Sequence, residues 1–357
     1  MVEIDPSRLG ELLDESGVDA VLFQHPPNLR QLCGFTGSEA VLLATRGKAR
    51  LFTDSRYTTQ ATLQTSNVEV IEVRERAKDL CAFLVQQGLG KVGFEAATLT
   101  VSQLQKFQEL CSGNLDWVPL VDQLSRLRAR KSPRQLEAML HAAQLNRDAF
   151  ESILPLVEPG RSESDIAIEL ECALRRAGGE EKAFDFIVAS GERGALPHGV
   201  ASDKILASGE LVTIDFGTRY QGYFSDETVT FALGTVDEKL RNIFDVVLEA
   251  HDRAIEAVRP GMALKDLDKV ARDIIDSHGF GEFFGHGLGH GVGLEIHEYP
   301  VVSPRSKAIA EEGMVVTIEP GIYIPGLGGC RIEDMVVVTP GGCQVLTKID
   351  KQFKVVN

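Results

Sequence analysis

The stretch LVTIDFGTRYQGYFSDETVTF, residues 211–231, consists of two β-rich runs separated by a short turn at 220–222. This pattern predicts an antiparallel hairpin. If the turn is centred between the first two of those turn residues, Asp215 lies directly opposite Asp226, with Cβ atoms about 4.5–5.5 Å apart. Because apolar and small residues flank Asp215, the hairpin predicts two carboxylates that face each other inside the protein.

A second hairpin is predicted in MVVTIEPGIYIPGLGGCRIEDMVVV, residues 314–338. Its strands, 314–323 and 332–338, are joined by a proline- and glycine-rich loop, a composition typical of turns. A hairpin centred on Gly326 places Glu319 opposite Glu333. The sequence therefore predicts a second pair of facing carboxylates.

Like charges placed directly opposite each other on a half-buried sheet are destabilising. A fold that does this twice in its most apolar strands needs a compensating cation. Four carboxylates with one or two histidines match the ligand demand of two divalent metals that share bridging ligands. Oxygen-rich coordination without thiolate favours manganese, or cobalt or iron, over a structural zinc.

The histidine-rich stretch GHGLGHGVGLEIHEYP, residues 285–300, supplies the nitrogen ligands. His286 and His290 are four apart, the spacing of a zinc-binding pair on a helix. Five alternating glycines, each costing a helix about 1 kcal/mol relative to alanine, exclude that interpretation. An extended backbone pressed against a cavity is predicted instead, with a strand over 292–298.

The first 125 or so residues alternate short β-rich runs with helical patterns, which predicts an α/β layer domain with a mixed sheet. Strands are predicted at 19–23, 40–53 (a hairpin), 68–73 and 91–95, and helices near 7–17, 77–88 and 101–112.

The character of the chain changes at Ser132-Pro133-Arg134-Gln135, a strong helix-start signal. We therefore predict two domains, residues 1–128 and 129–357, with the connection at 126–132. In the second domain, four helices are predicted. The first covers about 25 residues after Ser132, the second ends at Gly178, the third begins at a capping box at 235–238, and the fourth covers 264–277. Strands are predicted at 184–190, 211–217, 223–233, 292–298, 314–323 and 332–338. Two helix pairs interleaved with antiparallel strands make this an α+β domain.

Composition excludes several classes of protein. The net charge is −15, from 52 acidic and 37 basic residues, which is the wrong sign for a nucleic-acid binder. The basic cluster RLRARKSPR, residues 126–134, could bind phosphate, but a solvated interdomain connection is the preferred interpretation. No apolar run approaches the roughly 18–20 residues of a membrane span. Six scattered cysteines without a C-x-x-C motif indicate reduced thiols and a cytoplasmic protein.

These residues resemble the pita-bread metallopeptidases, the group of methionine aminopeptidase, aminopeptidase P and prolidase. The resemblance covers essentially the whole chain and is closest to the Xaa-Pro-cleaving branch. The segments that carry it, in the order of the family, are GFTGSEAVLL, LFTDSRYTTQA, FIVASGERGALPHG, IDFG, YFSDETVTF, GHGLGHGVGLEIHEYP, TIEPGIYI and RIEDMVVV. It implies a pita-bread catalytic domain preceded by a creatinase-type N-terminal domain.

The resemblance also implies the roles of individual residues. Five would be metal ligands: Asp226 and Glu333 bridging both ions, His290 and Glu319 on one ion, and Asp215 on the other. Further residues would act on the substrate: Glu319 as general base and later acid, His297 at the oxyanion, and His198 near the scissile bond. His286 would line the substrate side, and Tyr323 and Arg331 would orient substrate or relay protons. Because a prolyl nitrogen has no N–H to recognise, we also expect an apolar pocket, lined by Phe186, Tyr223 and His286.

The implied activity is hydrolysis of the peptide bond between an N-terminal residue and proline, by a hydroxide that bridges two divalent ions, with Mn²⁺ favoured and Co²⁺, Zn²⁺ or Fe²⁺ as alternatives. Short peptides with proline second are the implied substrates, and a homodimer is expected. Two positions depart from the branch: Val229 and Val301 stand where arginine is common. The second departure weakens a strict Xaa-Pro dipeptidase, which stays an alternative.

Three competing functions fit these residues less well. Creatinase, which shares the scaffold, works without metal and its relatives lack the carboxylate set that this chain keeps. Methionine aminopeptidase would not need the N-terminal domain. A binding protein that has lost catalysis would typically have lost ligands, whereas all five positions stand here.

Overall fold

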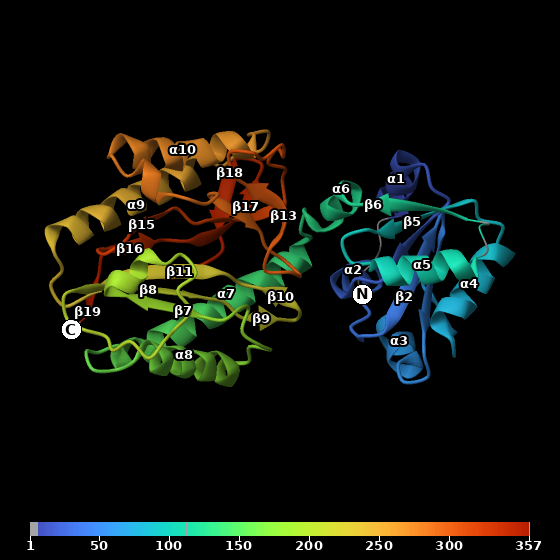
Figure 1. The fold of residues 1–357 in the computed structure, drawn as a ribbon, viewed down its shortest axis with the longest axis horizontal. Coiled ribbons are helices and arrows are strands. Elements are labelled where there is room, and N and C mark those ends of the chain that lie inside the picture. Colours follow the sequence, from blue (N-terminus) through green and yellow to red (C-terminus); the bar gives the residue numbers. More distant parts are fainter. Residues whose placement is uncertain (1–5, 112, 114, 357) are drawn as a thin grey trace. The chain divides into compact units, whose positions relative to one another are not determined.

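The computed structural model describes residues 6–111, 113 and 115–356. The chain divides into two compact units, Met1–Arg128 and Ala129–Asn357. Figure 1 shows the first unit in blue to green and the second in green to red. The N-terminal unit contains one sheet and the C-terminal unit several, and each unit has its own hydrophobic cores.

The N-terminal unit is built on one six-stranded sheet with the order β4-β3-β2-β1-β5-β6. Its strands are β1 (Ala20–Phe23), β2 (Ala40–Thr45), β3 (Lys48–Thr53), β4 (Glu69–Glu72), β5 (Lys91–Glu95) and β6 (Asp116–Leu120). β2 pairs antiparallel with β1 and β3, whereas β1–β5, β3–β4 and β5–β6 are parallel. The predicted mixed sheet is confirmed.

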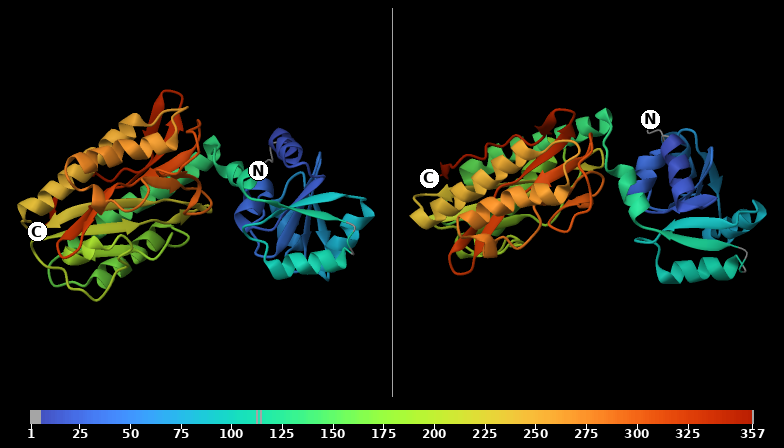
Figure 2. Two further views of the ribbon diagram at one scale, coloured as in Figure 1. Left: turned by 45° about the horizontal axis from the view of Figure 1, so that its top comes forward. Right: turned by 90° about the horizontal axis from the view of Figure 1, so that it is seen from above.

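Helices cover both faces of this sheet, as Figure 2 shows. They are α1 (Pro6–Ser16), α2 (Pro26–Cys33), α3 (Thr58–Gln64), α4 (Arg76–Gln86), α5 (Val101–Leu110) and the short α6 (Asp122–Ser125). Alternate residues of one strand serve the two faces: Val21 and Phe23 belong to the core beneath α1 and α2, and Ala20 and Leu22 to the core beneath α4 and α5. Burial on both faces explains why these strands read as continuous apolar runs.

Two helix pairs form the outer layers of the C-terminal unit, on opposite sides of its strands (Figure 1). α7 (Pro133–Ile153) packs with α8 (Glu163–Ala177), and α9 (Glu238–Ala257) packs with α10 (Leu264–Ser277). Ser132 and Gln135 form the predicted capping box at the start of α7. The capping box predicted at Thr235 is wrong, because Asp237 caps α9 instead by accepting a hydrogen bond from the Lys239 amide.

The strands between the helix pairs form two larger sheets, ordered β19-β11-β8-β7 and β13-β12-β14-β17-β18, and two ribbons, β10-β9 and β15-β16. The strands are β7 (Ile187–Ser190), β8 (Glu210–Phe216), β9 (Arg219–Tyr220), β10 (Tyr223–Phe224), β11 (Glu227–Leu233), β12 (Gly289–Gly291), β13 (Glu298–Val302), β14 (Val315–Ile318), β15 (Gly321–Ile324), β16 (Gly328–Arg331), β17 (Asp334–Thr339), β18 (Gly342–Val345) and β19 (Val355–Val356). The predicted α+β class is confirmed.

Two further expectations concern membrane-spanning segments and the redox state of the cysteines. Among the residues that the structure describes, no helix has both the length and the apolar character to cross a membrane. All six cysteines are free thiols, and four of them are buried.

Candidate metal centre

The first carboxylate hairpin forms with a different register from the predicted one. Its two central turn residues, Gln221 and Gly222, have φ of 47° and 77°, the left-handed pair that a two-residue type I′ turn requires. The turn is therefore centred one position later, and Asp215 lies opposite Thr228 rather than Asp226. Because this shift changes each partner by two residues, Asp226 remains on the same face as Asp215, one diagonal step away.

The second hairpin has the predicted register on both sides of its carboxylates. Ile318 pairs with Asp334 at the end of the β14–β17 ladder, and Gly321 pairs with Arg331 at the start of the β15–β16 ladder. The predicted continuous strands are interrupted between these ladders, next to Pro320, which has no N–H to donate to a ladder. Glu319 and Glu333 lie in this interruption.

His290 lies in the middle of the short strand β12, so the extended backbone is confirmed. A Cβ added at Gly289 would collide with the Thr317 carbonyl, and one at Gly291 with the Tyr299 carbonyl. These glycines are needed because neighbouring backbones approach them closely. The strand predicted over 292–298 is wrong: pairing shifts after His290, and β13 begins only at Glu298.

Three of the five predicted ligands converge closely. Ligand atoms of Asp226, His290 and Glu333 all lie within 4.8 Å of one another. The fourth, Glu319, places Oε1 at 3.4 Å from the Nε2 atom of His290. Asp215 places Oδ1 in the interior, where it has no hydrogen-bond partner among the residues that the structure describes. An unpaired buried carboxylate oxygen beside three clustered ligands is the donor set that a hard divalent cation requires.

The electrostatics of the carboxylate cluster, like its geometry, indicate a site for bound cations. Burial raises the pKa of Asp226 and of Glu333 well above their usual range, and neighbouring carboxylates add to both shifts. Burial likewise raises the pKa of Glu319 to about 8. Without a cation these acids repel one another and hold protons, whereas bound cations favour their ionised forms.

The imidazole of His290 is neutral, the form in which histidine binds a metal ion. Burial, reinforced by His297, lowers its pKa to about 4. Its Nδ1 lies 3.1 Å from the Gly291 carbonyl oxygen, which can only accept, so Nδ1 carries the proton. The lone pair of Nε2 is left facing Asp226 and Glu319, which is the tautomer a metal site needs.

A chain of hydrogen bonds leads away from Asp215. Arg331 donates to Asp215 Oδ2 at 2.6 Å and to the Tyr323 hydroxyl at 2.8 Å. That hydroxyl lies 3.0 Å from His286 Nε2. His286 is neutral because burial lowers its pKa to about 4, and its Nδ1 donates to the Gly287 carbonyl at 2.8 Å. Tyr323 therefore donates to His286, and burial raises the pKa of Tyr323 to about 12.

The other predicted histidines lie beside this set. The rings of His297 and His290 have centroids 4.2 Å apart. His198 is exposed in the turn after the 3-10 helix Gly191–Ala195, and its charge contributes to the lowered pKa of both His286 and His297. Arg331 holds this turn by donating to the Pro197 carbonyl at 3.0 Å.

Of the three residues predicted to line the proline pocket, His286 belongs to the hydrogen-bond chain described above, and Phe186 and Tyr223 have the following surroundings. Phe186 is buried in the core beneath α7 and α8, edge-on to Phe216. The Tyr223 hydroxyl accepts from Gln135 at 2.9 Å, next to the start of α7. Val229 also faces the core beneath α7 and α8, so this departure from the family pattern is a packing position and not a group at the metal centre.

Sequence reasoning missed two threonines that orient the carboxylates. The Thr228 hydroxyl donates to Glu333 Oε2 at 2.6 Å. The Thr317 hydroxyl donates to Glu319 Oε1 at 3.2 Å and accepts from the His290 amide at 3.0 Å. Both threonines stand two residues from a ligand along an extended segment, a spacing that could have revealed them because such residues share a face.

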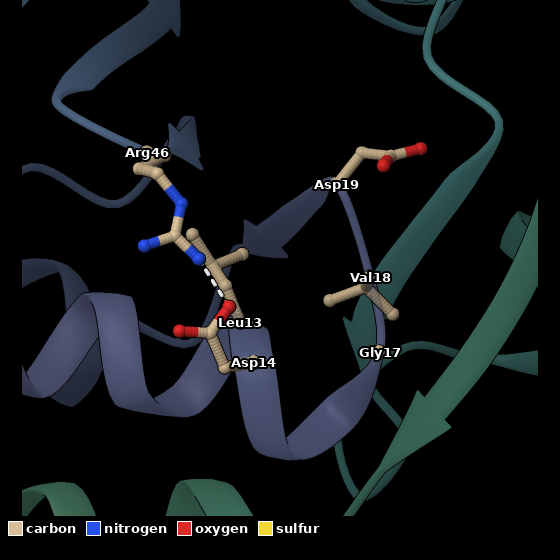
Figure 3. Close-up of a pocket in the computed structure, with 6 residues that line it drawn as sticks. All are labelled: Leu13, Asp14, Gly17, Val18, Asp19 and Arg46. Carbon is tan, nitrogen blue, oxygen red and sulfur yellow. Dashed lines mark hydrogen bonds and ion pairs between the residues drawn. The ribbon is translucent and has the colours of Figure 1, made fainter.

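A surface depression of the N-terminal unit is drawn in Figure 3. It is lined by Leu13, Asp14, Gly17, Val18, Asp19 and Arg46, and an ion pair joins Asp14 to Arg46. None of the residues predicted for the metal centre belongs to it, so it does not compete with the carboxylate cluster as the catalytic site.

A buried acidic cluster with a neutral histidine, in a fold of two helix pairs around strands, indicates a protein that uses divalent metal ions. The profile of metallopeptidase family M24 matches residues 137–340, and that of the creatinase/prolidase N-terminal domain matches residues 7–130. The chain belongs to metallopeptidase family M24. The predicted resemblance is thereby confirmed.

Individual relatives match along the full chain. An Xaa-Pro dipeptidase of Pyrococcus furiosus is 37% identical, covering 97% of this chain and 98% of its own. The solved structure of an Xaa-Pro dipeptidase from Bacillus anthracis superposes with a TM-score of 0.96 at 40% identity, with 98% of each chain covered. That of an X-Pro aminopeptidase from Thermotoga maritima gives 0.89 at 35% identity, covering 97% of this chain and 100% of that one.

Proposed function

We propose that this metallopeptidase hydrolyses the bond between an N-terminal residue and a following proline in short peptides, using two divalent ions held by Asp215, Asp226, His290, Glu319 and Glu333. The convergence of Asp226, His290 and Glu333 within 4.8 Å carries the proposal. The unpaired Oδ1 of Asp215 and the nearby Oε1 of Glu319 supply the remaining ligands. Asp226 and Glu333 would be the ligands common to both ions.

Two ions in this site would supply Lewis acidity, lowering the pKa of a water molecule and polarising the scissile carbonyl. Because the donors are mainly oxygen atoms, Mn²⁺ is the favoured ion, with Co²⁺, Zn²⁺ or Fe²⁺ as alternatives. Glu319 takes up a proton from the attacking water and returns it to the leaving nitrogen. Its Oε1 lies 3.4 Å from His290 Nε2, so the Glu319 carboxylate is inside the cluster where that exchange would take place.

The histidines and Arg331 position the substrate. His297, beside His290, donates to the developing oxyanion, and the exposed His198 contacts the substrate near the scissile bond. Arg331, Tyr323 and His286 are linked by successive hydrogen bonds, which fix these side chains on the side of the site next to Asp215.

The length of the accepted peptide distinguishes an aminopeptidase P-like enzyme from a strict Xaa-Pro dipeptidase. Arginine commonly follows the H-E-x-P motif in prolidases, where it can hold the free carboxylate of a dipeptide; here Val301 follows His297–Pro300. We therefore favour an aminopeptidase P-like enzyme that accepts longer peptides. The names of the Pyrococcus and Bacillus relatives favour the second version, a strict Xaa-Pro dipeptidase.

The test compares an Xaa-Pro dipeptide with an Xaa-Pro-Xaa tripeptide, each offered to metal-free protein reconstituted with Mn²⁺, Co²⁺ or Zn²⁺. Cleavage of both peptides is expected, with Mn²⁺ the most effective ion. Cleavage of the dipeptide alone would establish the strict dipeptidase instead. Full activity of the metal-free protein would refute the mechanism. Light scattering during the same preparation tests the expected homodimer.

A further inference from the structure

A buried ionic network lies directly behind the two proposed shared ligands. Glu227 follows Asp226, and Asp334 follows Glu333. Because successive side chains of an extended backbone point to opposite faces, the second residue of each pair points away from the metal centre. Glu227 is fully buried and Asp334 is 5% exposed. Two further acidic groups are therefore placed in the interior, one behind each shared ligand.

One ammonium group bridges these two carboxylates. Lys351 places Nζ at 2.5 Å from Glu227 Oε1 and at 3.3 Å from Asp334 Oδ1. The lysine is 9% exposed, so the interaction is poorly screened by solvent.

The segment that carries Lys351 supports both carboxylates with further contacts. The Ile349 amide donates to Glu227 at 3.2 Å, and the Thr347 hydroxyl donates to Asp334. On its other side, Asp334 Oδ2 lies 3.1 Å from His251 Nε2 on α9. Beyond Lys351 the chain continues as β19, which pairs with β11. The segment therefore contacts β17 through Thr347 and follows β11 from Ile349 onward.

The two proposed shared ligands precede strands of different sheets, so their separation depends on contacts between those sheets. Asp226 precedes β11 in the four-stranded sheet, and Glu333 precedes β17 in the five-stranded sheet. On the metal side, the Glu333 amide donates to the Thr228 carbonyl at 3.1 Å. On the opposite side, Lys351 joins the same two strands.

We propose that Lys351 is a positioning residue that holds β11 and β17 at the separation at which Asp226 and Glu333 can share two metal ions. This inference rests on the proposed function, because it assumes that these two carboxylates are the shared ligands. Removing a partner from a buried ion network leaves uncompensated charge. Without the ammonium, Glu227 and Asp334 would repel each other and the strands behind the metal ligands would separate.

The experiment compares four full-length proteins: wild type, Lys351→Met, Lys351→Arg and Lys348→Met. Lys348 is an exposed lysine of the same segment and serves as the matched control. Metal-free samples are titrated calorimetrically with Mn²⁺, and loaded samples are measured by electron paramagnetic resonance, because the exchange coupling of two Mn²⁺ ions depends on their separation. Circular dichroism checks that each protein is folded.

Lys351→Met should weaken binding of the second Mn²⁺ by about 10–100-fold, the range typical when a residue that supports metal ligands is lost, and should change the exchange-coupled signal. Lys351→Arg should restore most of both properties, and Lys348→Met should match wild type. If Lys351→Met does not fold, Lys351→Met/Glu227→Gln, which removes one charge of each sign, takes its place. Failure of both to fold would assign Lys351 to general stability and overturn the inference.

Two further outcomes separate this inference from the proposed function. Wild-type affinity and an unaltered coupled signal in Lys351→Met would overturn the positioning role while leaving the proposed function intact. A wild-type protein that binds no pair of Mn²⁺ ions would overturn the proposed function, and the inference with it.

Discussion

Arg331 donates to Asp215 at 2.6 Å in the interior of the C-terminal unit, where the arginine is 4% exposed and the aspartate 8% exposed. This guanidinium is the cation that partly balances the acidic cluster in the metal-free protein. It also holds Tyr323 and the turn that carries His198.

Arg331→Met should destabilise the metal-free protein by about 3–5 kcal/mol, because it leaves buried carboxylates without their partner. With Mn²⁺ bound, the loss should be smaller, since the ions compensate the same charges. Chemical denaturation with and without Mn²⁺ measures the difference. Equal losses in both states would contradict this role of Arg331.

Asp226→Asn should lower activity by at least about a thousandfold and abolish tight binding of a metal pair. In the metal-free state it should instead stabilise the protein by about 1–2 kcal/mol, because a buried carboxyl with a raised pKa lowers stability at neutral pH and an amide does not carry this cost. Thermal unfolding of metal-free samples tests this opposite effect, with the exposed Asp245→Asn as control. A less stable Asp226→Asn would argue that the carboxylate is structural. The N-terminal unit should stay folded in either case.

Metal binding near pH 7 should release protons. The pKa of Glu319 is raised from an ordinary 4.5 to about 8, chiefly by burial. The folded metal-free protein therefore binds more protons than the unfolded chain between those values, and its stability should fall as pH rises from about 5 to 8. With Mn²⁺ bound, this fall should disappear. Calorimetric titration in buffers of different ionisation enthalpy counts the protons; a count of zero at pH 7 would refute the shift.

Thr228→Val should reduce Mn²⁺ affinity by about 10–100-fold, because the Thr228 hydroxyl that orients Glu333 at 2.6 Å is lost while the side-chain volume is kept. Thr228→Ser retains the hydroxyl and should bind Mn²⁺ nearly as wild type does. The comparison rests on metal titrations of both variants. If the serine variant binds as weakly as the valine variant, packing and not the hydrogen bond would be responsible.

Local sequence signals predicted most of the framework. Capping at Ser132, the glycines around His290 and the alternation in 211–231 each act within a few residues, so they could be interpreted without the fold. The wrong predictions arose where two local conformations fit the sequence almost equally well, as for the position of the turn in the 211–231 hairpin. A turn centred one residue later moved the partner of Asp215 from Asp226 to Thr228, because Gln221 and Gly222 are the residues of this turn that take the required left-handed conformations.

Short-range patterns of residues were enough to identify the residue types of the proposed metal centre, its two acidic hairpins and glycine-flanked histidine, and the α+β class. Which atoms meet depends on the packing of the folded chain. The contacts of Arg331 with Asp215, of Thr228 with Glu333 and of Lys351 with Glu227 join residues about a hundred positions apart. Such contacts depend on how separate sheets pack against each other, and no short-range pattern of residues specifies that packing.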